Sequence, residues 1–149
     1  MKIRFGSKAH HDFFVSAVEK AKTYHDPYHL ALFYTLGMTA ETRRNIAALY
    51  DFKEHGIIFN GLIAGWQTGT SVKVTRLAFN LFNGFAGDSE IGDSPSLYTP
   101  YELFCNGLLP YCLEAVKLRY PEYSSEAEYL FKQDEQDDQD YEGDDEYEP

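Results

Sequence analysis

The chain has 149 residues, of which 44% are hydrophobic and 16% aromatic, with 12 Tyr and 11 Phe. This length favours one folded domain, because a single core serves about 100 to 200 residues, and the composition excludes a wholly disordered chain. The formal net charge of -11 argues against nucleic-acid binding as the main activity, since phosphate contacts need an excess of Lys and Arg.

The acidic residues gather at the C-terminal end. Residues 1–121 carry 12 basic and 11 acidic side chains, and so a net charge of +1. Residues 122–149 carry 13 acidic side chains and one base, Lys132, for a net charge of -12. We therefore predict a helical globular domain over residues 1–121, a docked extension over 122–133 and a disordered acidic tail over 134–149.

Two features of the sequence bear on the compartment. The basic N-terminus is not followed by an apolar segment, and the uncharged run near residues 56–66 is far shorter than the about 20 residues of a membrane span. Cys105 and Cys112 are spaced about two turns apart on a helix, too far for an intrahelical disulfide. We expect a cytoplasmic protein with two reduced, largely buried thiols, and a redox role stays open as the alternative.

Three helices are predicted in the N-terminal third. Apolar side chains recur at helical spacing over residues 8–24, after Ser7 as the N-cap. Asp26 followed by proline predicts the start of a short buried helix over residues 27–36. A third helix, capped by threonine, is expected over about residues 39–50.

Glycines divide the middle of the chain. Residues 53–69 contain four glycines among apolar side chains, so we expect this connection to pack on the body with a short hairpin or helical turn. Thr70 or Ser71 is the expected cap of a fourth helix with a wide apolar stripe, which ends near Gly84. We expect this helix to be the central one.

The start of the fifth helix is the strongest local signal. Thr99 is a cap residue, Pro100 occupies the first helical position, and Glu102 occupies the third, where its side chain can bond back to the cap. A break at Asn106-Gly107 precedes a last helix over residues 111–120. The predicted fold class is mainly α, a compact single-domain bundle of about five to six helices with a small β element.

Histidines at helical spacing are weak candidates for a metal site. His25 and His29 stand four residues apart, with Asp26 and the pair His10-His11 as further potential ligands. Pro27 weakens this set, because it places His25 before the start of the helix. Since no further motif completes four ligands, we predict no cofactor and favour structural or surface histidines.

Two acidic residues and the single tryptophan are weighed in the same way. Glu102 and Glu114 lie in otherwise apolar helices, where a buried pair of carboxylates would be an acid–base candidate. Capping explains Glu102, and a place on the helix surface explains Glu114, so we favour structural roles. Trp66 is favoured as a core anchor over a ligand platform.

Basic residues of the body are candidates for a binding face. They are Arg43, Arg44, Lys73, Arg76, Lys117 and Arg119. Interspersed surface charge is the favoured alternative. If the face exists, the acidic tail can fold back on it and compete with an anionic ligand, an autoinhibition that weakens as salt rises.

The acidic tail is the most unusual feature of the sequence. Its acidic and aromatic side chains are Asp137, Asp138, Asp140, Tyr141, Glu142, Asp144, Asp145, Glu146, Tyr147 and Glu148. A line of negative charge with interleaved tyrosines can imitate a phosphate backbone towards a basic protein groove. The alternative is that the tail serves only solubility.

Four segments of the body form a recognisable combination: Trp66-Gln67-Thr68, Leu77-Ala78-Phe79-Asn80-Leu81-Phe82-Asn83-Gly84, Thr99-Pro100-Tyr101-Glu102-Leu103-Phe104, and Lys117-Leu118-Arg119-Tyr120-Pro121-Glu122-Tyr123. In them the chain resembles a family of short proteins of unknown function from low-GC Gram-positive bacteria, their phages and mobile elements. The resemblance brings no established catalytic residues. It implies a mobile-element setting, in which small acidic proteins often inhibit host defence, as anti-CRISPR proteins do by blocking nucleic-acid grooves.

These observations lead to one expected function and two alternatives. We expect a non-enzymatic protein-binding module, an inhibitor that occludes the basic nucleic-acid groove of a host-defence nuclease. Its partner-binding candidates are Asp137, Asp138, Asp140, Tyr141, Asp144, Asp145, Glu146 and Tyr147 of the tail, together with Arg43, Arg44 and Arg76. The alternatives are a small metal-dependent hydrolase that uses the histidines, and a nucleic-acid-binding protein autoinhibited by its tail.

Overall fold

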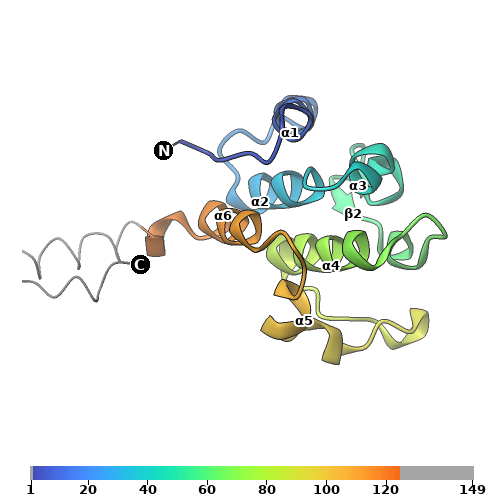
Figure 1. The fold of residues 1–149 in the computed structure, drawn as a ribbon. Coiled ribbons are helices and arrows are strands. Elements are labelled where there is room, and N and C mark those ends of the chain that lie inside the picture. The colour runs from blue at the N-terminus through green and yellow to red at the C-terminus, as the bar shows by residue number, and fades with distance from the viewer. Residues whose placement is uncertain (1, 125–149) are drawn as a thin grey trace, which may run out of the picture. The chain divides into compact units, whose positions relative to one another are not determined.

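The computed structural model describes residues 2–124 of the chain and shows a mainly helical fold (Figure 1). The α-helices of these residues are α1 (Lys8–Ala21), α2 (Pro27–Leu36), α3 (Ala40–Arg44), α4 (Gly69–Asn83), α5 (Pro100–Phe104) and α6 (Leu109–Arg119). Short 3₁₀ turns are η1 (Ile46–Ala48), η2 (Phe59–Ile63), η3 (Ser89–Ile91) and η4 (Pro95–Tyr98). The strands β1 (Tyr50–Asp51) and β2 (Gly56–Ile57) pair in antiparallel register. The predicted fold class is confirmed.

The predicted N-caps at the start of α1, α2 and α5 are confirmed. The Ser7 side chain accepts a hydrogen bond from the His10 amide, and the Asp26 carboxylate accepts from the amides of the first turn of α2. Thr99 accepts from the Glu102 amide at α5. Helix α1 ends three residues earlier than predicted, because Lys22 adopts a left-handed conformation with φ of 57° that stops the helix.

The helix predicted over residues 39–50 is wrong in its second half. Helix α3 ends at Arg44, where the Asn45 side chain donates a 2.7 Å hydrogen bond to the Glu41 carbonyl oxygen and so competes with the helical ladder. The chain continues through η1 into β1, with Tyr50 opposite Ile57 in the hairpin. The expected short hairpin and helical turn in the glycine-containing connection are therefore present as β1, β2 and η2.

Helix α4 begins earlier than predicted. Its N-cap is Thr68 instead of Thr70 or Ser71, because the Thr68 hydroxyl accepts from the Ser71 amide while the Ser71 hydroxyl accepts from the Thr68 amide. Gly84 ends the helix as predicted, with a φ of +78° that favours glycine. The two reciprocal hydrogen bonds between Thr68 and Ser71 determine the residue at which α4 begins.

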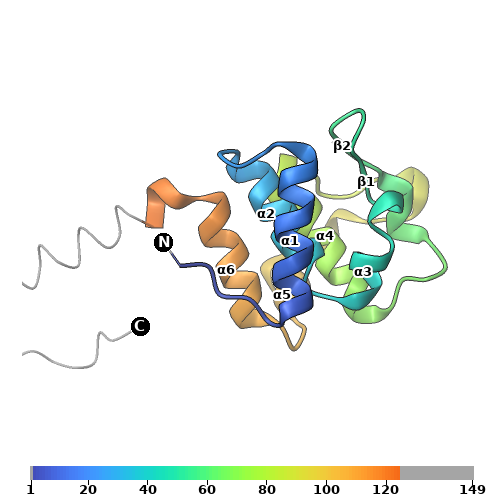
Figure 2. The same ribbon diagram turned by 90° about the horizontal axis from the view of Figure 1, so that it is seen from above.

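The core is built around α2 together with α4, the helix predicted to be central. Every side chain from Ala31 to Leu36 is buried, and α2 packs against α1, α4 and α6. Figures 1 and 2 show α2 between α1 and α4, with α5 on the far side of α4. The largest fully buried side chains include Tyr34, Tyr50, Phe33 and Phe79, so aromatic rings form much of the core.

The two cysteines differ from the expectation in their placement. Both are free thiols, as predicted, but Cys105 is exposed at the end of α5 while Cys112 is buried in α6. The break at Asn106-Gly107 separates the two helices, so the thiols do not share the face of one helix. The prediction that both are largely buried is wrong for Cys105.

The chain divides into two compact units after Arg119. The first unit, Met1–Arg119, holds all the elements named above. In the second, the described residues 120–124 form a helical turn in which the Ser124 amide donates to the Tyr120 carbonyl oxygen. The predicted acidic tail and most of the predicted extension lie outside the described residues. None of the helices within residues 2–124 combines the length and apolar character that crossing a membrane requires.

Candidate functional site

An apolar groove lies between the N-terminal arm, defined as residues 2–6, and the outer faces of α1 and α2. We call it the apolar groove. It is lined by Ile3, Phe14, Val15, Val18, Glu19, Tyr24 and Leu30 and has a volume of about 280 Å³. Its rim leaves apolar side chains in contact with solvent, since Tyr24 is 55% and Val15 36% exposed.

Helical spacing on α1 forms the floor and one side of the groove. Phe14 and Val18 are one turn apart and are buried, while Val15 and Glu19 lie on the adjacent, exposed stripe. The left-handed end of α1 turns the chain towards α2 and leaves Tyr24 at the rim. The local sequence thus determines which part of the apolar stripe stays uncovered.

The N-terminal arm supplies the opposite wall. It runs in an extended conformation from the side of α6 to the first turn of α1 (Figure 2). Ile3 lines the groove, and the Phe5 ring packs 5.5 Å from the Phe14 ring centroid to centroid. Because side chains alternate along an extended chain, the intervening Arg4 faces away, and its guanidinium lies 5.4 Å from the centre of the Tyr111 ring.

Three hydrogen bonds hold the arm to three different helices. The Arg4 amide donates to the Glu114 carboxylate of α6 at 2.7 Å, and the Tyr34 hydroxyl of α2 donates to the Arg4 carbonyl oxygen at 2.6 Å. The Gly6 amide donates to Nδ1 of His10 in α1 at 3.1 Å. Glu114 and Tyr34 are distant from the arm in sequence, and they reach it only because α6 and α2 pack together with α1. The arm can therefore form this wall of the groove only in the folded protein.

The size and lining of the groove limit what it can bind. Pockets for drug-sized molecules and cofactors usually measure about 300–1,000 Å³, so about 280 Å³ suits one or two side chains better. Glu19 is the one charged side chain among the described residues that line it. An apolar side chain with a neighbouring positive charge matches this chemistry, whereas a phosphate or carboxylate ligand finds no cation in the lining.

A second, smaller cleft lies at the other end of the arm. It measures about 230 Å³ and is lined by Gly6, Ser7, His10, Met38, Arg43, Leu108 and Tyr111. His10 is 2% exposed, and its Nε2 lies 2.7 Å from the Tyr34 carbonyl oxygen. Burial, followed by the positive charge of Arg43, holds the pKa of His10 below its ordinary value despite the bond to Tyr34.

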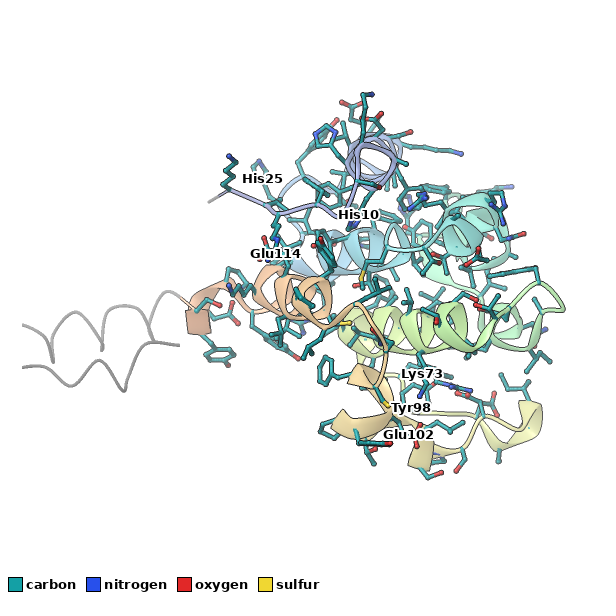
Figure 3. All side chains as sticks on the ribbon, viewed as in Figure 1. His10, His25, Lys73, Tyr98, Glu102 and Glu114 are labelled. Atoms are coloured by element: carbon teal, nitrogen blue, oxygen red, sulfur yellow. The ribbon has the colours of Figure 1, made fainter. Side chains whose placement is uncertain are left out.

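The structure separates the histidines proposed as metal ligands. His25 is exposed at the surface (Figure 3). His29 has Nδ1 2.5 Å from the Asp26 carboxylate and Nε2 3.0 Å from the Tyr50 hydroxyl oxygen, so both ring nitrogens have protein partners. Within residues 2–124 no three His, Cys, Asp or Glu side chains gather closely enough to hold a metal ion.

The chain of Asp26, His29 and Tyr50 has the order of a carboxylate, imidazole and hydroxyl relay. Tyr50 is only 1% exposed, and burial raises the pKa of its hydroxyl to about 12, with smaller effects of Asp26 and Asp51. A nucleophile must reach its substrate and lose its proton, and Tyr50 is placed to do neither. We therefore interpret the three residues as a structural link between α2 and β1.

Glu102 and Glu114 do not form a pair. Figure 3 shows them in different parts of the unit, Glu114 on α6 and Glu102 on α5. The Glu102 carboxylate lies 3.2 Å from the Lys73 ammonium nitrogen, which links α5 to α4, and Glu114 accepts the amide of the arm. Glu102 therefore stabilises the packing of α5 on α4 through Lys73, and Glu114 holds the arm on α6.

Of the basic candidate residues, Arg43 and Arg44 lie on α3 and Arg76 lies on α4. Arg43 donates to the Gly37 carbonyl oxygen at 2.7 Å, and exposed Arg44 lies 3.7 Å from Glu41. Arg76 Nε lies 3.0 Å from the carboxylate of Asp93, which is 3% exposed. The candidate residues of the acidic tail lie outside the described residues. Trp66, which the sequence favoured as a core anchor, is half-buried near the start of α4.

Comparison with protein families gives a match to a model of a family of unknown function, DUF6075, over residues 1–132. The chain belongs to this family. The DUF6075 match contains every described residue of the apolar groove, the arm and its three anchors, and stops before ten of the acidic residues at the C-terminal end. No curated protein and no solved structure gives a significant match.

Sequence reasoning missed the groove of this DUF6075 chain. The alternation of Ile3 and Phe5 around Arg4 fits either an edge strand or a packed arm, and it does not identify the residues against which this segment packs. The contact between Arg4 and Glu114 joins residues 110 positions apart, which no local pattern reports. Tyr24 is the last residue of the predicted first helix, and no pattern in the sequence indicated that its side chain would be exposed.

Proposed function

We propose that this chain is a non-enzymatic protein-binding module whose apolar groove receives an aliphatic or aromatic side chain from a basic partner protein. The observation that carries the proposal is the groove itself, an apolar cleft with exposed Tyr24 and Val15 at its rim. Apolar anchors that enter such clefts supply most of the binding energy at protein interfaces. The groove lies inside the region shared with the family.

Charge supports a basic partner. Glu19 is the charged group of the groove lining, and a Lys or Arg next to the apolar anchor would pair with it. The chain as a whole carries a formal charge of -11, which steers positively charged partners towards it. The segment recognised by the groove is therefore an apolar residue beside Lys or Arg.

The acidic C-terminal sequence extends the proposal to a mode of inhibition. A protein that handles nucleic acid exposes a basic groove, and a line of carboxylates competes with phosphates for it. We propose that the folded unit anchors the partner while the acidic sequence occludes its nucleic-acid groove, in the setting of a bacterial mobile element that the family resemblance implies. The partner would then be a host-defence nuclease.

The test is a selection from a displayed library of random peptides against the full chain, followed by affinity measurements on the peptides obtained. We expect enrichment of an apolar residue beside Lys or Arg. Tyr24→Ala and Val15→Asp should weaken binding by about tenfold or more, because they remove or charge the rim of the groove. Glu19→Lys should weaken the basic peptides selectively.

The matched control is Tyr101→Ala, which removes a tyrosine that is 72% exposed on α5, outside the groove lining. It should leave peptide affinity unchanged. Enriched peptides that bind the Tyr24→Ala and Val15→Asp variants as tightly as the unaltered chain would contradict the groove as the binding site. A library that yields no enriched sequence would contradict the proposed function as a whole.

A further inference from the structure

The N-terminal arm is held by an imidazole whose two nitrogens face partners of opposite kind. Nε2 of His10 lies 2.7 Å from the Tyr34 carbonyl oxygen, which can only accept a hydrogen bond. Nδ1 lies 3.1 Å from the Gly6 amide nitrogen, which can only donate one. The ring therefore carries its proton on Nε2 and accepts from the arm through Nδ1, and both bonds exist together only in the neutral imidazole.

A second proton on His10 is incompatible with the docked arm. It would be added to Nδ1, where the new N–H points at the N–H of Gly6, so that an attractive contact becomes a contact between two donors. The ring has little room to turn away, because the rings of Phe5, Tyr34 and Tyr111 surround it. A Cβ atom added at Gly37, the C-cap of α2, would lie only 2.7 Å from Cδ2 of His10, so the backbone at this end of α2 encloses the ring closely.

The charged groups around His10 do not relieve this conflict. Arg43 of α3 lines the same cleft and repels a positive imidazole. Glu114 of α6 would attract it, but its carboxylate already accepts the Arg4 amide of the arm. The Tyr34 hydroxyl stays protonated, because burial raises its pKa far above the ordinary value, and it too is bonded to the arm. Tyr111 faces the ring edge-on from α6.

We propose that His10 is a proton-operated latch, and that its protonation at Nδ1 releases residues 2–6 from the body. Ile3 is one wall of the apolar groove, so release of the arm dismantles that wall. The consequence for partner binding rests on the proposed function, whereas the release of the arm does not. A partner anchored in the groove would in turn hold the arm in place and keep His10 neutral.

The experiment is an NMR titration of the full chain from about pH 7.5 downwards, following the His10 ring nitrogens and the contacts of the arm. At the start, the nitrogen shifts should report a proton on Nε2 alone. Because burial lowers the pKa of His10 from its ordinary value, we expect the ring to take up its second proton at a more acidic pH than an exposed histidine does. The nuclear Overhauser contacts between Phe5 and Phe14 should be lost with the same midpoint, while the helical signals of α2 and α4 persist.

Two variants separate the latch from the other histidines. The His10→Gln variant lacks the titrating group, so the arm contacts that this variant retains should not change with pH. His55→Asn, in the exposed turn between β1 and β2, should keep the full transition. If His10→Gln does not fold, the titration of the unaltered chain still decides the matter through the coincidence of the two midpoints.

The proposal is overturned if arm contacts persist after His10 has titrated, or if His10 stays neutral until the helices themselves unfold. Its failure is distinguishable from that of the proposed function. If peptides bind at pH 7.5 but the arm stays docked at low pH, the latch is rejected and the proposed function is not. If the arm is released at low pH but no peptide binds at pH 7.5, the proposed function is rejected and the latch is not.

Discussion

Asp93, which is 3% exposed, illustrates what a buried polar side chain with specific partners contributes. Its carboxylate accepts from the Arg76 guanidinium and from the Tyr98 hydroxyl, and its backbone pairs with Asp88 across the loop that follows α4. Burial and the hydrogen bond to Asp93 raise the pKa of Tyr98 far above its ordinary value, so this hydroxyl remains a donor. Asp93 thereby ties the loop that follows α4 back to α4 itself.

Asp93→Asn should destabilise the chain strongly. The substitution leaves the half-buried Arg76 guanidinium without its carboxylate, and loss of one partner of a buried pair costs about 3–5 kcal/mol. The free energy of unfolding from urea titrations measures the loss. Asp12→Asn is the matched control, because the ion pair of Asp12 with Lys8 is exposed and its removal should leave stability unchanged within error. Equal stability of the two variants would contradict the role assigned to Asp93.

At the scale of the element, capping residues determine where the helices begin. Asp26 and Thr99 could be identified from the sequence, because each precedes a proline at the first helical position and the signal is local. The start of α4 could not, since Thr68, Thr70 and Ser71 are all acceptable caps. Only the reciprocal bond from the Ser71 side chain selects Thr68.

Thr68→Ala should therefore cost about 1 kcal/mol of unfolding free energy, the usual value for a lost N-cap. Thr70→Ala removes an exposed threonine two residues further on, inside the first turn, and should have no comparable effect. Thermal or urea unfolding of the two variants makes the comparison. A larger loss for Thr70→Ala would move the cap to the position predicted from the sequence.

At the scale of the whole molecule, the fold class was predictable and the candidate site was not. Helical periodicity and glycine breaks report on neighbours within a few residues, and they located most of the helices. The apolar groove needs an N-terminal arm, a left-handed helix end at Lys22 and an anchor at Glu114 to come together. Such contacts between distant residues are set by packing, and the sequence pattern of any one segment does not contain them.

The division of charge between body and C-terminal sequence also belongs to this scale. Consider a variant that ends at Lys132, the limit of the family match. At about 1 M salt, where the Debye length is about 3 Å, we expect this variant and the full chain to bind groove peptides with the same affinity. At low salt the full chain should bind basic peptides faster, because its acidic sequence attracts them. Stopped-flow association rates measure the difference. Identical rates at low salt would show that the acidic residues play no part in binding.

The most direct measurement for the account as a whole is the mapping of methyl NMR shifts on the full chain at pH 7.5 as a selected peptide is added. If the apolar groove is the binding surface, the methyl signals of Ile3, Val15, Val18 and Leu30 should move together and saturate with the peptide affinity. The exposed methyl groups of Leu109 and Leu113 on α6 should stay in place. Shifts confined to α6, with the groove unmoved, would contradict the proposed function.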